Sequence, residues 1–358
     1  MQKSKTFIVS LISILMGLIV GAFFMTLTGH NALDAYTFLF KGGLQSIERV
    51  GNTLATATPL VLTGLSVAFA FRTGLFNIGA PGQMLFGGFL ASAVGLTFDL
   101  PAPLLLLSVI LAGILGGAFI AAIPGLLKAK FNVNEVVSCI MMNWISYWVV
   151  YYTIQNNFTG HMETESKQLA DAATLRAPWL SELFGGSYIN LGILIALFTT
   201  LLVAFILNKT TFGYELKAVG FNRHAAEYAG ISVNKNIVLS MMIAGALAGL
   251  AGVCQYAGNA NAIQIGVLPS QGFDGIAVAL LGATTPFGSF LAAIFFGLLY
   301  SGRGFMSAMT EVPPEIADTI IATIIYFAAT SVLVTNLLDT FIAKRKKAKE
   351  ATLPKEDN

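Results

Sequence analysis

The chain has 358 residues, of which 56% are hydrophobic and only 11% are charged. A soluble domain carries roughly 25% charged residues, so this composition excludes an ordinary soluble protein and indicates one that crosses a membrane several times. The net charge of +2 does not suggest a nucleic-acid-binding protein, which needs a strongly basic surface. Cys139 and Cys254 lie inside apolar runs without a His or Cys at ligand spacing, so both are predicted to be small buried side chains.

Stretches of about 20 apolar residues predict an all-α, polytopic transmembrane bundle with about ten spans. The first stretch is too long for a signal peptide and is expected to be retained. The third and eighth stretches are rich in glycine and begin with polar residues, so either could be a broken or re-entrant helix. The predicted spans are residues 7–27, 52–71, 76–98, 103–127, 134–154, 187–207, 235–257, 272–287, 289–310 and 316–338.

The basic residues predict the orientation of these spans. With the N-terminus in the cytoplasm, 15 of the 20 lysines and arginines fall inside and five outside, as the positive-inside rule expects. The inside set is Lys3, Lys5, Arg72, Lys128, Lys130, Lys209, Lys217, Arg223, Lys235, Lys344, Arg345, Lys346, Lys347, Lys349 and Lys355; the outside set is Lys41, Arg49, Lys167, Arg176 and Arg303. Both termini are then cytoplasmic. Residues 1–340 form a membrane domain, and residues 341–358 form a basic tail expected to anchor the last helix at anionic headgroups.

A polar insert, FGYELKAVGFNRHAAEYAGI at residues 212–231, separates two long apolar stretches on the cytoplasmic side. Asn222 is a good N-cap and alanines follow it, so Asn222–Ala229 is predicted to be a short exposed helix. Arg223 and Glu227, four residues apart, can pair on its surface. A membrane protein that holds such a helix in water between two spans is expected to dock it on another protein.

Two glycine-containing segments resemble each other, FNIGAPGQM at 76–84 and GFDGIAVALLG at 272–282. Each follows one span and begins another, and five spans separate them, so the two units would have opposite orientations. Inverted repeats with interrupted helices at matching positions are typical of transporters, and the interruptions tend to mark the pathway. The alternative is that Gly and Pro are simply common in membrane helices.

Polar residues within the predicted spans are candidates for lining a pathway, because polar groups in a membrane usually face the bundle interior. Asn134 and Glu135 have a structural alternative as the N-cap and first-turn carboxylate of their helix. Asn143 lies about two turns into that span and either bonds another helix or lines a cavity. Asp274 either caps the helix that follows or meets a polar solute. The full candidate set is Asn77, Gln83, Asn134, Glu135, Asn143 and Asp274.

Small residues predict where helices approach closely. Gly113 and Gly117 form one GxxxG pattern, and Gly245 and Gly249 form another. Neither pattern needs a functional explanation.

No sequence motif for chemistry is present: there is no Walker A sequence, no GxSxG, no HExxH and no paired-carboxylate or His-rich metal motif. The chain is therefore predicted not to be an enzyme and to bind no metal or cofactor of its own. It also lacks the series of intramembrane charges that proton-coupled transporters often need. If the protein drives active transport, the energy must come from another chain.

Four segments resemble the permease subunits of bacterial binding-protein-dependent ABC importers, the branch that takes up simple sugars, nucleosides and branched-chain amino acids. They are FNIGAPGQM, NEVVSCIMMN at 134–143, the insert from Thr211 with the following MMIAGALAGLAG, and GFDGIAVALLG. The guanosine and nucleoside permease type is the closest, and the resemblance covers roughly residues 50–340. Pro81 and Phe221 depart from the family pattern.

The resemblance implies that residues 211–231 are a coupling segment that docks in a groove of an ABC ATPase subunit, which uses the ATP. Ala225, Ala226 and Tyr228 would contact that groove, and Gly220 and Gly230 would permit the turns at either end. The expected coupling residues are Gly213, Glu215, Gly220, Asn222, Arg223, Ala225, Ala226, Tyr228 and Gly230.

The same resemblance implies a second permease subunit, in a heterodimer rather than a homodimer, and an extracellular substrate-binding lipoprotein, all in or on the lipid bilayer of the bacterial plasma membrane. The cargo is expected to be a nucleoside. Two alternatives stay open: the same type of importer for ribose or another monosaccharide, and a self-sufficient secondary transporter or channel.

Overall fold

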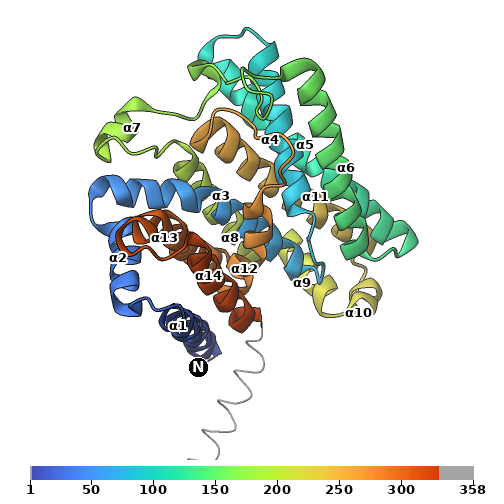
Figure 1. The fold of residues 1–358 in the computed structure, drawn as a ribbon. Helices are drawn as coiled ribbons and strands as arrows, with labels where there is room; N and C mark the ends of the chain where they lie inside the picture. Colours follow the sequence, from blue (N-terminus) through green and yellow to red (C-terminus); the bar gives the residue numbers. More distant parts are fainter. Residues whose placement is uncertain (1, 330–358) are drawn as a thin grey trace, which may run out of the picture.

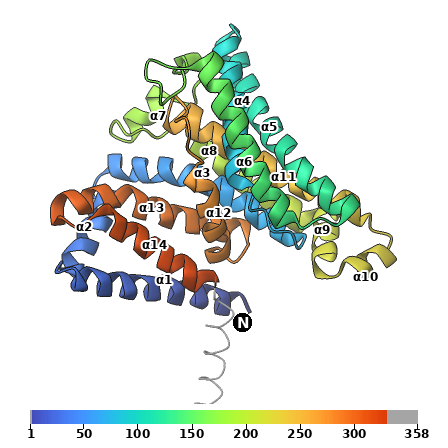
Figure 2. The same ribbon diagram turned by 45° about the vertical axis from the view of Figure 1, so that its right-hand side comes forward.

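The computed structural model describes residues 2–329, so the predicted basic tail and the end of the last predicted span lie outside the described residues. Within that range the chain is helical, and its extended pairs are two isolated bridges between loops. This confirms the predicted all-α class. Figures 1 and 2 show one bundle, with the short helices α7 (Pro178–Leu183) and α10 (Arg223–Tyr228) at opposite ends. We call these the α7 end and the α10 end.

The remaining helices are α1 (Gln2–Leu27), α2 (Ala32–Leu44), α3 (Ile47–Arg72), α4 (Ala80–Thr97), α5 (Ala102–Phe131), α6 (Glu135–Thr153), α8 (Gly192–Lys209), α9 (Thr211–Phe221), α11 (Val233–Cys254), α12 (Ser270–Leu281), α13 (Pro286–Thr310) and α14 (Pro314–Ala329). Short π-helical turns, Ile154–Phe158 and Gln255–Asn259, extend α6 and α11.

Six described helices are long and apolar enough to cross a membrane: α1, α3, α5, α8, α11 and α13. Three others, α4, α6 and α14, coincide with further predicted spans. The predicted span 272–287 is interrupted, in agreement with its broken-helix alternative: α12 has only 12 residues, and the chain turns before α13 begins at Pro286. At 1.5 Å per residue α12 is about 18 Å long, well short of the roughly 30 Å of a bilayer core. A second doubtful span, 76–98, contains a full helix, but that helix begins only at Ala80.

Helix α3 lies at the centre of the bundle, and 83% of the residues in its apolar 18-residue stretch are buried. It packs against α2, α8, α11, α12 and α13. Helices α5 and α11 cross where the two GxxxG patterns meet. A Cβ at Gly117 would lie 2.7 Å from the backbone of Gly249, and one at Gly245 would lie 3.0 Å from the Gly117 carbonyl carbon. Only glycine permits this approach, which confirms the packing predicted for both patterns. Cys139 and Cys254 are fully buried and unpaired, as predicted.

The two segments predicted to begin opposite units meet inside the bundle. Gly272, near the start of α12, lies against the backbone of Pro81, near the start of α4, with no room for a Cβ. Thr63 in the middle of α3 donates to the Gln271 carbonyl, and Arg72 at the end of α3 reaches Thr284 beyond α12. Helix α12 therefore runs parallel to α3, whereas α4, which follows α3 in the chain, runs antiparallel to it. The predicted opposite directions of α4 and α12 are confirmed, and a duplication of sequence stays a prediction.

Candidate functional site

Two short helices form the α10 end. The Thr210 hydroxyl accepts a hydrogen bond from the Gly213 amide at 3.1 Å and caps α9. Asn222, in an extended conformation, caps α10 by accepting from the Ala225 amide, also at 3.1 Å. Gly230 follows with a φ of +81°, which few other residues adopt. The predicted exposed helix is confirmed, and α9 precedes it as a second helix that the sequence analysis did not separate from the insert.

Several residues expected to contact a partner instead hold this segment on the bundle. Glu215 accepts from the Asn236 side chain of α11 at 2.9 Å. Gly213 packs against the end of α8. Ala226 is only 3% exposed, because it packs with Val219 and with α11. Ala226 also lines the groove between α9 and α10, so its expected contact with a partner stays a prediction.

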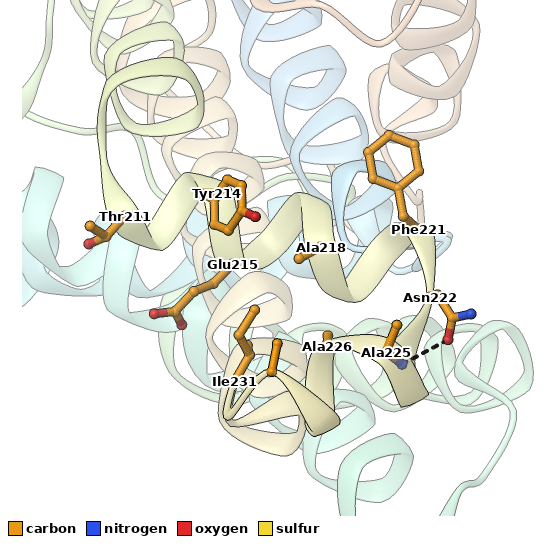
Figure 3. Close-up of a pocket in the computed structure, with 10 residues that line it drawn as sticks. Thr211, Tyr214, Glu215, Ala218, Phe221, Asn222, Ala225, Ala226 and Ile231 are labelled. Carbon is orange, nitrogen blue, oxygen red and sulfur yellow. Dashed lines mark hydrogen bonds between the residues drawn. The ribbon is translucent and has the colours of Figure 1, made fainter.

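The outward side of the segment is aromatic. Tyr228 is 95% exposed, Phe221 90% and Tyr214 71%, while Ala225 is also exposed. A groove of about 710 Å³ runs between α9 and α10, with Ala218 on one wall and Ala225 on the other (Figure 3). Exposed aromatic rings beside a groove of small residues are suited to protein contact. The sequence analysis missed Phe221 and Tyr214 as surface contacts, although aromatic residues in a polar insert were the available signal.

The charged pair expected on α10 does not form. Arg223 is half-buried and Glu227 exposed, and no ion pair joins these two described side chains. An exposed pair at this spacing would contribute only a few tenths of a kcal/mol.

A chain of contacts leads from this segment to α12. Gly220 lies within α9 rather than at a turn, which corrects its expected role: its backbone packs on the Arg72 carbonyl at the end of α3. The Arg72 guanidinium donates to the Thr284 carbonyl from Nε at 3.1 Å and from Nη2 at 2.8 Å. Ala283 and Thr284, between α12 and α13, both have a φ of +52°. These contacts connect α9, through Arg72, with a turn whose backbone is in a restricted conformation.

Three of the predicted pathway residues bond one another or the backbone instead of facing open space. The Asn77 side chain donates to Gln83 at 2.8 Å, and Gln83 donates back at 2.9 Å. Asn143 of α6 accepts from the Gly82 amide at 2.9 Å and donates to the Ile78 carbonyl at 3.0 Å. All three side chains are at most 3% exposed. Asn77 and Asn143 satisfy backbone groups of the extended connection into α4, and Gln83 bonds Asn77, so these contacts support packing while a pathway role stays a prediction.

The other three candidates differ from one another. Asn134 caps α6 by accepting from the Val136 amide at 2.9 Å, which supports its structural alternative. Glu135 forms an ion pair with Lys128 of α5 at 3.0 Å. Asp274 on α12 has a buried oxygen, Oδ2, without a hydrogen-bond partner among the described residues. Of the six, Asp274 alone has such an unsatisfied oxygen within the described part of the chain, and it is the one that remains a candidate to meet a polar solute.

The fold and this segment define a multi-pass membrane protein that presents a pair of short helices, with exposed aromatic rings, between two spans. Residues 49–329 match the model of the family described as branched-chain amino acid transport system / permease component, so the chain belongs to that family. It is a permease component of an ABC transporter, and not an enzyme.

Three curated relatives cover most of the chain. It is 45% identical to the guanosine ABC transporter permease protein NupP of Bacillus subtilis (strain 168), over 92% of this chain and 95% of that protein. It is 40% identical to the nucleoside ABC transporter permease protein NupB of Lactococcus lactis subsp. cremoris (strain MG1363), over 99% and 98%. It is 32% identical to the glucose ABC transporter permease protein TsgB13 of Haloferax volcanii, over 89% and 86%. A second guanosine permease of the same Bacillus strain, NupQ, is 29% identical over 70% and 80%.

Proposed function

We propose that this chain is a transmembrane permease subunit of an ATP-driven nucleoside importer in the bacterial plasma membrane. The observation that carries the cargo assignment is the 45% identity, over 92% of the chain, to a permease named for guanosine. A permease named for nucleosides is 40% identical over 99% of the chain. The predicted orientation places the α10 end in the cytoplasm and the α7 end outside. Both termini then lie in the cytoplasm, in agreement with the distribution of basic residues.

The α9–α10 segment is proposed to dock on a separate ABC ATPase, which binds and hydrolyses the ATP. The exposed Phe221 and Tyr228 rings and the groove beside them support this assignment. Movement of α9 against Arg72 would carry the ATPase closure to the turn at Thr284 and so to α12 and α13. Rigid-body movement of that kind switches a transporter between its two access states.

A second, different permease subunit is proposed to complete the pathway. The support is that one Bacillus strain has two permeases named for guanosine, and this chain is much more similar to one than to the other. An extracellular substrate-binding lipoprotein is proposed to deliver the cargo to the α7 end.

A monosaccharide importer is the second candidate, because a glucose permease is 32% identical over most of the chain. Uptake of labelled guanosine by cells with and without the gene distinguishes the two candidates. Loss of uptake in the deletion strain, with competition by excess unlabelled uridine but not by ribose, supports a broad nucleoside importer.

Retention of guanosine uptake in the deletion strain, in a background without other nucleoside transporters, contradicts the nucleoside assignment. Loss of ribose uptake in the same strain would then establish the sugar alternative.

A further inference from the structure

A polar cleft of about 620 Å³ lies at the α7 end, between α3, α13 and α14. The first three turns of α3 contribute Asn52 and Thr56, the second half of α13 contributes Tyr300 and Arg303, and α14 contributes Asp318. None of these residues was a candidate from the sequence, because they come from three separate helices. The cleft is far from the α9–α10 groove, at the opposite end of the molecule.

Contacts between neighbouring lining residues fix the side chains on both walls of this cleft. Tyr188, which is 45% exposed, shares a 2.7 Å hydrogen bond with the Thr56 hydroxyl, and its amide donates to the Asn52 side chain at 3.1 Å. On the other wall the Arg303 guanidinium lies 5.4 Å from the centre of the Tyr300 ring. The cleft thus holds two aromatic rings among hydroxyl and amide groups, which suits a solute with both a flat ring and hydroxyls.

The charges in and beside the cleft are mainly negative. Arg303 pairs with Asp318 at 2.8 Å, and these side chains remain 41% and 51% exposed. Glu315 lines the cleft as well, and Asp274 interacts electrostatically with Tyr300 and with this pair. Among the lining residues, the two carboxyl groups of Glu315 and Asp318 against the one guanidinium of Arg303 give a net negative lining. Such a site repels a phosphorylated solute and accepts a neutral one.

We propose that this cleft is the outer binding station of the translocation pathway, and that it takes an uncharged solute with an aromatic ring and hydroxyl groups, a nucleoside without phosphate. The Asp274 carboxyl of α12, which hydrogen-bonds the lining residue Tyr300 and keeps Oδ2 without a partner, lies next to this station. The identity of the cargo rests on the proposed function, whereas the position of the pathway rests on the cleft itself.

Gly304 offers a direct test, because it lines the cleft and a Cβ there meets no atom within 4 Å. The assembled importer carrying Gly304→Cys is reacted with the anionic sulfonatoethyl methanethiosulfonate. The cysteine thiolate takes up the sulfonatoethylthio group to form a mixed disulfide, and methanesulfinate leaves. Uptake of labelled uridine should be near wild type before the reaction and fall at least tenfold after it. Excess unlabelled uridine, present during transport, should slow the modification.

Two controls accompany this variant. The wild-type chain should be insensitive to the reagent, since both of its cysteines are fully buried. Glu163→Cys, in an exposed loop at the α7 end, should react and gives the reference rate for a thiol outside the cleft.

The charge of the cleft is tested with the same two cysteine variants and a cationic trimethylammonium-ethyl reagent. The ratio of cationic to anionic reaction rates should be several-fold higher for the Gly304→Cys variant than for the Glu163→Cys variant, and Asp318→Asn should reduce the excess. An equal ratio in both variants contradicts the assignment to an uncharged rather than an anionic solute.

The experiments distinguish an error in placing the cleft on the pathway from an error in the proposed nucleoside cargo. If the thiol of the Gly304→Cys variant does not react in the assembled importer, or reacts without loss of uptake, the cleft is not on the pathway. If the wild-type importer carries ribose but not uridine, the nucleoside assignment fails, and the modification assay is then read with labelled ribose.

Discussion

Replacing Gly220 by alanine tests whether the docking segment drives the pathway through Arg72. The added Cβ would lie 3.1 Å from both the Arg72 carbonyl carbon and the Gly74 amide nitrogen, and closer still to the Arg72 carbonyl oxygen. All three atoms belong to backbone, so no side-chain rotation relieves the contact. Helix α9 must move away from the end of α3 by about 1 Å to restore an ordinary separation from the Arg72 carbonyl oxygen.

The size of the effect follows from that displacement. Adding a methyl group to a fully packed contact typically costs about 1–3 kcal/mol. If that cost applies to the state in which α9 presses on Arg72, the coupling between the two ends falls by roughly 5- to 150-fold. The exposed face of α9 and α10 is unchanged, so association with the ATPase should be retained.

The assay compares ATP hydrolysis and nucleoside uptake by the same importer in proteoliposomes. For Gly220→Ala we expect an assembled complex that hydrolyses ATP, with the amount of cargo moved per ATP reduced at least fivefold. Gly125→Ala in α5 is the matched control, because its Cβ meets no atom closer than 3.0 Å. Wild-type cargo per ATP in an assembled Gly220→Ala importer would refute the role of this contact.

Three further predictions concern the residues that the structure reassigns. Phe221→Ala and Tyr228→Ala, which remove exposed rings, should each weaken association of the ATPase by about 1–3 kcal/mol, as measured by titration of the detergent-solubilised permease with the ATPase. Neither change should lower the thermal stability of the permease. Ala226→Asp should reduce the yield and the melting temperature of the permease, because it buries a charge without a partner. Asn143→Ala should lower the melting temperature, since the buried Gly82 amide loses its acceptor at a cost of about 1–3 kcal/mol, while the KM for cargo stays within about twofold.

Each of these predictions has a matched control. Phe98→Ala, at a half-exposed ring away from α9 and α10, should leave ATPase association unchanged. Ala225→Asp, on the exposed side of α10, is the control for Ala226→Asp and should preserve the melting temperature. Asn156→Ala, which removes an exposed amide, is the control for Asn143→Ala and should also preserve it. Normal stability of the Ala226 variant would contradict its burial. A large rise in KM for the Asn143 variant, without loss of stability, would return that residue to the pathway.

The sequence predicted the features that depend on neighbouring residues. The α10 helix followed from the Asn222 cap and the alanines after it, and the α5–α11 contact followed from two GxxxG patterns. Local signals of this kind are sufficient, because caps and small-residue faces act over one or two turns.

The features it did not predict depend on residues far apart in the chain. The Arg72 to Thr284 bond joins positions 212 residues apart, and the cleft joins three helices. The eighth span was expected to be broken or continuous, and the sequence did not locate the break, which the structure places at the turn of Ala283 and Thr284. Polarity alone selected Asn77 and Asn143, and the sequence could not show that their partners are Gln83 and the Ile78 carbonyl.

The most direct test of the central claim is reconstitution of this chain with the ATPase, the second permease and the binding protein of the same importer. Labelled guanosine uptake is measured with ATP, without ATP, and with the ATPase left out. The account predicts uptake only when ATP and the ATPase are both present. Uptake driven by an ion gradient through the permease alone would contradict it and establish a secondary transporter.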